Sequence, residues 1–193
     1  LSEFPCRYHI NQISSKKSLD VIKKNKNNGK KFSVGVSINN LSLNENDIGE
    51  FKTFLKISPP LRTEDDRIAL VQGIKENLID VIVSDHLPED EESKRLPFAQ
   101  AATGAIGIET LLPLALEMYH NESLPLMKII ETLTINPSKI LKINKGSLKN
   151  GSDGDICIFD LEAPWKLDAE KLKSKSKNTA IEERKLQGKV LMT

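Results

Sequence analysis

The chain has 193 residues, of which 38% are hydrophobic and 28% are charged, and its formal net charge is +1. This composition permits one sizeable hydrophobic core and argues against a disordered chain. The near-neutral charge gives no reason to expect nucleic acid as a partner, and no apolar run reaches the ~18 residues of a membrane span.

The predicted elements alternate between strands and helices over most of the chain. Ser14 or Ser15 can cap the first helix, Gly29 ends it, and Pro59-Pro60 breaks the chain before an acidic helix start. The charged segment 89–95 is predicted to be a loop. The predicted strands are residues 4–13, 32–38 and 79–84, and the predicted helices are residues 15–28, 63–77, 107–120, 126–133 and 136–143.

The character of the chain changes after Gly146. A turn at residues 151–155 precedes a predicted strand at residues 156–160, and another strand is predicted at residues 187–192. We therefore predict two units, residues 1–145 and a small β appendage of residues 146–193 with an irregular loop. The basic tract at residues 171–177 has no interleaved aromatic side chains, which indicates a solvated loop.

The third predicted strand ends in residues that can carry chemistry. Its apolar run is followed directly by Asp85 and His86, and then by Pro88 and Glu89. A buried parallel strand delivers side chains in this way to the C-terminal rim of an α/β barrel. The predicted fold class is therefore α/β, with a partial TIM-type (β/α) barrel.

Residues 85–89 (DHLPE) resemble the D-H-x-P-H element of the dihydroorotases, a family of cyclic amidohydrolases in the amidohydrolase superfamily. Six other segments resemble motifs of this family, in the same order and over almost the whole chain. They are residues 8–14 (YHINQIS), 56–62 (KISPPLR), 104–110 (GAIGIET), 136–141 (NPSKIL), 146–156 (GSLKNGSDGDI) and 173–179 (KSKSKNT). The resemblance implies a metal-dependent hydrolase barrel and the conversion of carbamoyl aspartate to dihydroorotate in pyrimidine biosynthesis.

The resemblance also implies a zinc cofactor, because opening a cyclic amide needs a metal-bound hydroxide, a Lewis acid and a proton carrier. In the family, an H-x-H pair and a bridging carboxylate group bind the metal in an N-terminal half. This chain does not contain that half and would supply only about half of the eight βα units of a barrel of ~250 residues. We therefore expect a fragment or a truncated gene.

The residues at the family's site positions are mostly substituted. Asp85 keeps the catalytic position beside the metal, whereas Gln12 replaces a metal-binding His, and a neutral amide is a poor zinc ligand. Ser58 replaces a substrate-contacting Asn. Glu89 replaces a substrate-side His and has the same charge as the substrate's carboxylate. Asn39-Asn40 replaces a pair of histidines. These substitutions predict impaired catalysis and no zinc bound by this chain alone.

Each of these residues also has a simpler explanation. Asp85 can cap a turn, and His86 and His9 can make local structural hydrogen bonds. His120 lies near a helix end, where it can compensate the helix dipole on the surface. These are the only three histidines in the chain, which are too few for a two-zinc site.

Three functional hypotheses remain open. The chain belongs to a dihydroorotase-like protein with degraded or absent activity, or it is a non-catalytic scaffold partner of aspartate carbamoyltransferase. Alternatively, it is an active half that a second dihydroorotase-like chain completes with the H-x-H pair. Cys6 and Cys157 lie far apart, form no metal-binding spacing and indicate a reduced, cytoplasmic setting.

Overall fold

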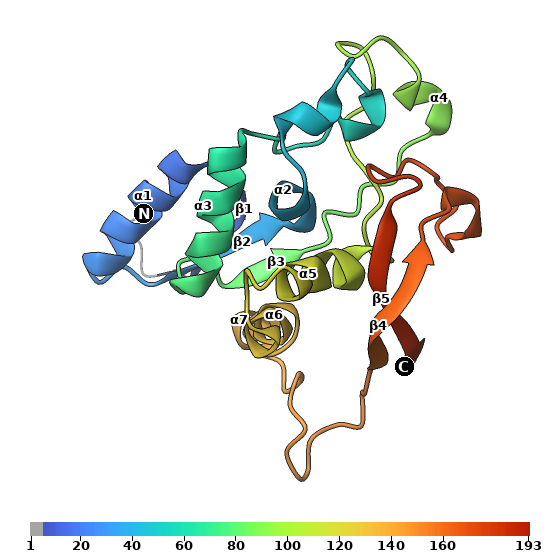
Figure 1. Ribbon diagram of the computed structural model, residues 1–193. Helices are drawn as coiled ribbons and strands as arrows, with labels where there is room; N and C mark the ends of the chain where they lie inside the picture. Colours follow the sequence, from blue (N-terminus) through green and yellow to red (C-terminus); the bar gives the residue numbers. More distant parts are fainter. Residues whose placement is uncertain (1–5) are drawn as a thin grey trace.

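The computed structural model describes residues 6–193, so the start of the first predicted strand, at residues 4–5, lies outside the described residues (Figure 1). The elements up to residue 83 are β1 (Tyr8–Ile13), α1 (Lys16–Asn27), β2 (Phe32–Ser37), α2 (Ile38–Ser42), η1 (Glu45–Ile48), η2 (Thr53–Leu55), α3 (Glu64–Lys75) and β3 (Val81–Val83). The later elements are α4 (Glu91–Lys94), α5 (Leu111–His120), α6 (Leu126–Leu133), α7 (Ile135–Leu141), β4 (Ile158–Lys166), η3 (Ala169–Lys171) and β5 (Lys185–Met192).

The first three strands form a parallel sheet in the order β1-β2-β3, as the alternation of strands and helices predicted. In β2, both Val34 and Val36 are completely buried, because helices cover the central strand. Ser15 caps α1 and Thr63 caps α3, and each hydroxyl accepts a backbone N–H of the first turn. The structure is therefore α/β, and the carboxyl ends of its three parallel strands lie at one edge.

The register between β1 and β2 is interrupted beside that edge. Ile10 pairs with Val34 and Ile13 pairs with Val36, so β1 contains one more residue than β2 over this stretch. Such a bulge redirects the side chains of the bulged strand. Gly35 lies opposite the bulge, where a Cβ atom would be only 2.2 Å from the carbonyl oxygen of Asn11. The absence of a side chain at residue 35 is therefore what lets the two strands approach.

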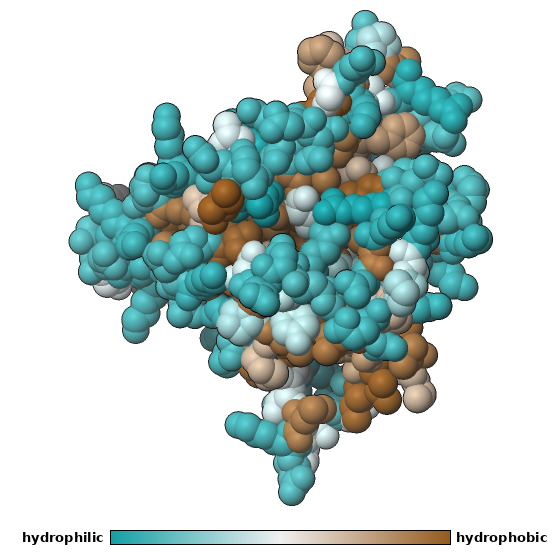
Figure 2. Space-filling model, in the orientation of Figure 1, coloured by the Kyte–Doolittle hydropathy of each residue, from teal (hydrophilic) through white to brown (hydrophobic). Residues whose placement is uncertain are grey.

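The last two strands form a separate antiparallel sheet that packs on α5. The Trp165 indole N–H donates a hydrogen bond to the carbonyl of Gly188 at 3.0 Å and ties β4 to β5. Near the C-terminal end of this ribbon, Figure 2 shows a hydrophobic patch on the surface. Exposed apolar side chains in this region are Ile156, Ile158, Leu191 and Met192. The boundary between residues 1–145 and 146–193 stays a prediction.

Most of the predicted elements are present, but several differ: the short helices η1, η2 and η3 were not predicted, and the helix predicted from residue 107 begins at Leu111. The segment 89–95 is not simply a charged loop, because it contains the short helix α4, and Lys94 at its end is buried. The helix α2 was not predicted. The strands β4 and β5 are longer than residues 156–160 and 187–192. No helix within residues 6–193 is both long and apolar enough to span a membrane.

We predict that Gly35→Ala destabilises the fold by about 3 kcal/mol, because the new methyl group would collide with the rigid backbone of β1. Gly154→Ala is the matched control, since a Cβ at that position meets no atom within 4 Å. Urea unfolding followed by circular dichroism measures both changes. A loss below about 0.5 kcal/mol for Gly35→Ala would show that the bulge does not depend on this glycine.

Candidate functional site

Two side chains from opposite sides of the sheet meet at the carboxyl edge. Gln12 lies in the bulged part of β1, and Asp85 lies two residues beyond the end of β3. The Gln12 Nε2 atom donates a hydrogen bond to Asp85 Oδ1 at 2.7 Å, across the end of the central strand β2. Both side chains are half-buried. This hydrogen bond between an amide and a carboxylate therefore connects β1 to the segment that follows β3.

The backbone around Asp85 is held in an unusual conformation. Asp85 has a φ of 50°, in the left-handed region that Asp tolerates better than most residues. His86 Nδ1 accepts the backbone N–H of Gly107 at 3.1 Å, which confirms the local structural role predicted for this histidine. A Cβ on Gly107 would lie 2.2 Å from the carbonyl oxygen of Ser84, so the two segments are in close contact. These contacts fix where the Asp85 carboxylate points.

The arrangement does not fit a zinc ion between Gln12 and Asp85. Two ligand atoms ~2.1 Å from a tetrahedral zinc lie roughly 3.4 Å apart, which is longer than the direct contact seen here. The Gln12 group that faces the carboxylate is the N–H donor, which has no lone pair for a metal. Over residues 6–193, no three His, Cys, Asp or Glu side chains are grouped closely enough to hold a metal ion.

The other two predicted site residues, Ser58 and Glu89, lie on loops. Ser58 is exposed and Glu89 is partly buried, and within the described residues no hydrogen bond joins either side chain to Gln12 or Asp85. The backbone N–H of Glu89 donates to Asn178 Oδ1 at 3.2 Å. The structure therefore brings together Gln12 and Asp85, while Glu89 is placed by a residue far along the chain.

The two asparagines on α2 are buried, each with 3% of its surface exposed. Asn40 Nδ2 donates to the carbonyl of Pro60 at 3.1 Å, which ties α2 to the loop that contains Ser58. Within the described residues, Asn39 Nδ2 and Asn40 Oδ1 have no hydrogen-bond partner. A buried amide group without a partner costs free energy, so this position is not optimised for stability alone.

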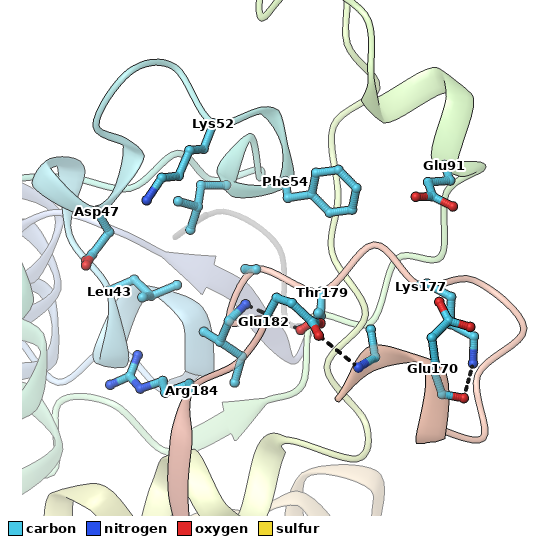
Figure 3. Close-up of a pocket in the computed structure, with 14 residues that line it drawn as sticks. Leu43, Asp47, Lys52, Phe54, Glu91, Glu170, Lys177, Thr179, Glu182 and Arg184 are labelled. Carbon is cyan, nitrogen blue, oxygen red and sulfur yellow. Dashed lines mark hydrogen bonds between the residues drawn. The ribbon is translucent and has the colours of Figure 1, made fainter. Parts of the chain in front are cut away.

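A cavity of about 590 Å³ lies away from these residues, between the region that follows α2 and the segment 169–184 (Figure 3). Its charged side chains have both signs: Asp47 and Lys52 come from one side, and Glu182 and Arg184 from the other. None of the predicted site residues lines this cavity. We therefore assign the candidate site to the edge of the sheet and not to this cavity.

Several motif residues connect distant segments of the chain through hydrogen bonds. The Glu109 carboxylate accepts the backbone N–H groups of Lys173 and Ser174 at 3.0 and 3.1 Å. The Asn136 amide donates to the carbonyl of Asp80 at 2.9 Å, next to β3. The sequence patterns identified these residues, but their contacts over long sequence separations became visible only in the structure. The bulge at Gln12 and the role of Asn178 were not predicted either.

His9 and His120 lie outside the candidate site. His9 Nδ1 is 2.8 Å from the Ser33 hydroxyl on the neighbouring strand, consistent with the structural role predicted for it. His120 ends α5 and its ring lies 5.3 Å from that of Tyr119. The lysines of the basic tract are mostly exposed, as predicted for a solvated loop.

Residues 9–193 match the amidohydrolase family. The chain is 45% identical over 186 residues to the dihydroorotase of Ehrlichia canis, an alignment that covers 96% of this chain and 42% of that protein. It is 41% identical to the dihydroorotase of Anaplasma phagocytophilum, over 100% of this chain and 43% of that protein. The chain thus spans about two fifths of the length of these relatives.

Similar folds occur among solved structures. The L-hydantoinase (dihydropyrimidinase) from Arthrobacter aurescens superposes with a TM-score of 0.89 at 28% identity, covering 97% of this chain and 43% of that one. The dihydropyrimidinase from Brevibacillus agri gives a TM-score of 0.88 at 20% identity, covering 96% of this chain and 42% of that one, and supports the fold alone.

We predict that Gln12 and Asp85 stabilise the fold as a pair. Gln12→Leu and Asp85→Ala should each be destabilising, and the double variant should cost about 1.5 kcal/mol less than the sum, because either change alone breaks the same charge-assisted hydrogen bond. Urea unfolding of the four proteins measures this coupling. Gln12→Leu combined with Glu89→Ala is the control and should be additive. Additivity of the Gln12 and Asp85 changes would contradict the pairing.

Proposed function

Because the chain belongs to the amidohydrolase family, we propose that it is part of a dihydroorotase-like protein of pyrimidine biosynthesis that acts in the cytoplasm. The reaction would be the interconversion of carbamoyl aspartate and dihydroorotate, by formation or hydrolysis of a cyclic amide. Two curated dihydroorotases that are 41–45% identical over nearly the whole chain support this proposal. We further propose that the three parallel strands belong to a TIM-type barrel.

We also propose that the site, as this chain builds it, is catalytically impaired. The observation that carries this part is the 2.7 Å hydrogen bond from Gln12 to Asp85. The carboxylate at the family's catalytic position is engaged by an amide N–H where the resemblance places an imidazole ligand. Because these side chains do not fit the family's zinc ion, we derive no metal-dependent step for this chain.

The charge of Glu89 supports the same proposal. Its backbone N–H is held by Asn178 four residues after Asp85, and the resemblance places its side chain toward the substrate. Both dihydroorotate and carbamoyl aspartate are anionic, and a like charge at about 4 Å costs about 1 kcal/mol even in a fully aqueous environment. The substitution of a substrate-side imidazole by Glu89 would therefore weaken substrate binding in addition to the loss of the metal ligand.

A second candidate function is a non-catalytic scaffold for aspartate carbamoyltransferase. Glu109 and Asn136 form the hydrogen bonds that connect distant segments of the fold. The position at which the resemblance expects a metal-binding His is Gln12. This contrast favours a role that needs the fold but not catalysis. Sedimentation velocity of the full chain mixed with purified aspartate carbamoyltransferase tests this candidate. A joint boundary would support it, and independent sedimentation at micromolar concentrations would exclude it.

We predict that the full chain with added zinc hydrolyses dihydroorotate no faster than zinc alone. The Gln12→His variant should not recover turnover, because one regained imidazole leaves Ser58 and Glu89 substituted, and losses within one catalytic unit are not recovered singly. Ultraviolet absorbance of dihydroorotate at alkaline pH follows the reaction.

Asp85→Ala is the control in this assay. Turnover by Gln12→His that exceeds the zinc-only rate and disappears in the Gln12→His, Asp85→Ala double variant would refute the impairment. Turnover by the unmodified chain that Asp85→Ala abolishes would refute it more strongly and would favour an active dihydroorotase.

A further inference from the structure

Among residues 6–193, the most deeply buried charged group lies at the end of α4. The Lys94 residue is 0% exposed, which is rare for a lysine. Its ammonium donates hydrogen bonds to the carbonyls of Lys56, Ala102 and Gly104 at 3.1, 3.0 and 2.9 Å. Three donors thus meet three acceptors, as a buried ammonium requires. Burial lowers the pKa of Lys94 to about 8.

Two of these carbonyls have a second donor, which extends the contact into a network. The carbonyl of Lys56 also accepts the backbone N–H of Gly104 at 2.9 Å. The carbonyl of Gly104 also accepts Asn178 Nδ2 at 3.3 Å. The Asn178 side chain is completely buried. It donates to the carbonyl of Leu87 at 3.0 Å and accepts the N–H of Glu89.

The network joins the segments that contain the substituted site positions. Lys56 lies two residues before Ser58, and Glu89 lies four residues after Asp85. The Lys56 ammonium itself donates to three carbonyls of residues 98–101, so the loop is held from both sides. Side chains on loops reach a defined geometry only where such contacts hold the backbone.

We propose that Lys94 and Asn178 are the positioning residues of the candidate site, which together hold the Ser58 loop and the Glu89 backbone at fixed places beside Asp85. Neither side chain needs to touch a substrate. The shared carbonyl of Gly104 couples the two residues, so that loss of one loosens the segment held by the other. The assignment of this region as a substrate site rests on the proposed function, whereas the coupling between Lys94 and Asn178 does not.

Amide hydrogen exchange measured by NMR on the full chain tests this coupling without metal or substrate. In Lys94→Met, we expect the amides of Ala102 and Gly104 to lose at least about tenfold in protection relative to the amides of β2. The amide of Glu89, which Lys94 does not contact, should lose protection as well. Lys17→Met is the control, because Lys17 is exposed, and it should leave all these amides unchanged.

A second variant, Asn178→Ala, tests the same coupling from the other residue if Lys94→Met does not fold. In Asn178→Ala, the Glu89 amide should lose its protection directly, and the Ala102 amide, which Asn178 does not contact, should lose protection relative to β2. If either variant affects only the amides next to its own side chain, the two residues are separate structural contacts and the proposal fails. A uniform loss of protection across β2 and the loops would also overturn it. Failure of dihydroorotate hydrolysis would leave these results unaffected.

Discussion

The hydrogen bond between Gln12 and Asp85 is the contact on which the functional interpretation of this structure depends. It exists because a bulge in β1 turns Gln12 toward the carboxyl edge of the sheet, and because Gly35 leaves room for that bulge. In a parallel sheet, the same edge receives the residues that follow every strand, so Asp85 arrives there from β3. The amide and the carboxylate satisfy each other at a distance too short to hold a zinc ion between them.

Around this contact, buried side chains hold the loops in place. The side chains of Asn178 and Lys94 form hydrogen bonds with backbone groups of these loops. Replacing either side chain would leave those buried backbone groups without a partner. Ser58, in contrast, is exposed, and the Glu89 side chain is only partly buried.

The sequence predicted the elements better than the site. The cap at Ser14 or Ser15, the acidic helix start at residues 63–66 and the apolar run before Asp85 follow from local chemistry, so α1, α3 and β3 lie where they were expected. The sequence predicted Lys94 in a charged loop, because a lysine among acidic residues gives no local signal that distant carbonyls will surround it. The contact of Gln12 with Asp85 spans 73 residues and depends on a bulge that periodicity does not encode. Contacts of this kind are set by tertiary packing, which only the structure supplies.

We propose that the amide of Gln12 occupies the place of a metal ligand beside Asp85. The proposal can be tested by a crystal structure of the full chain grown with excess zinc, with anomalous diffraction recorded at the zinc edge. We expect Gln12 Nε2 and Asp85 Oδ1 to remain in direct contact, with no anomalous peak within bonding distance of the carboxylate. A fully occupied peak bonded to Asp85, with Gln12 displaced or turned to present its oxygen, would contradict it.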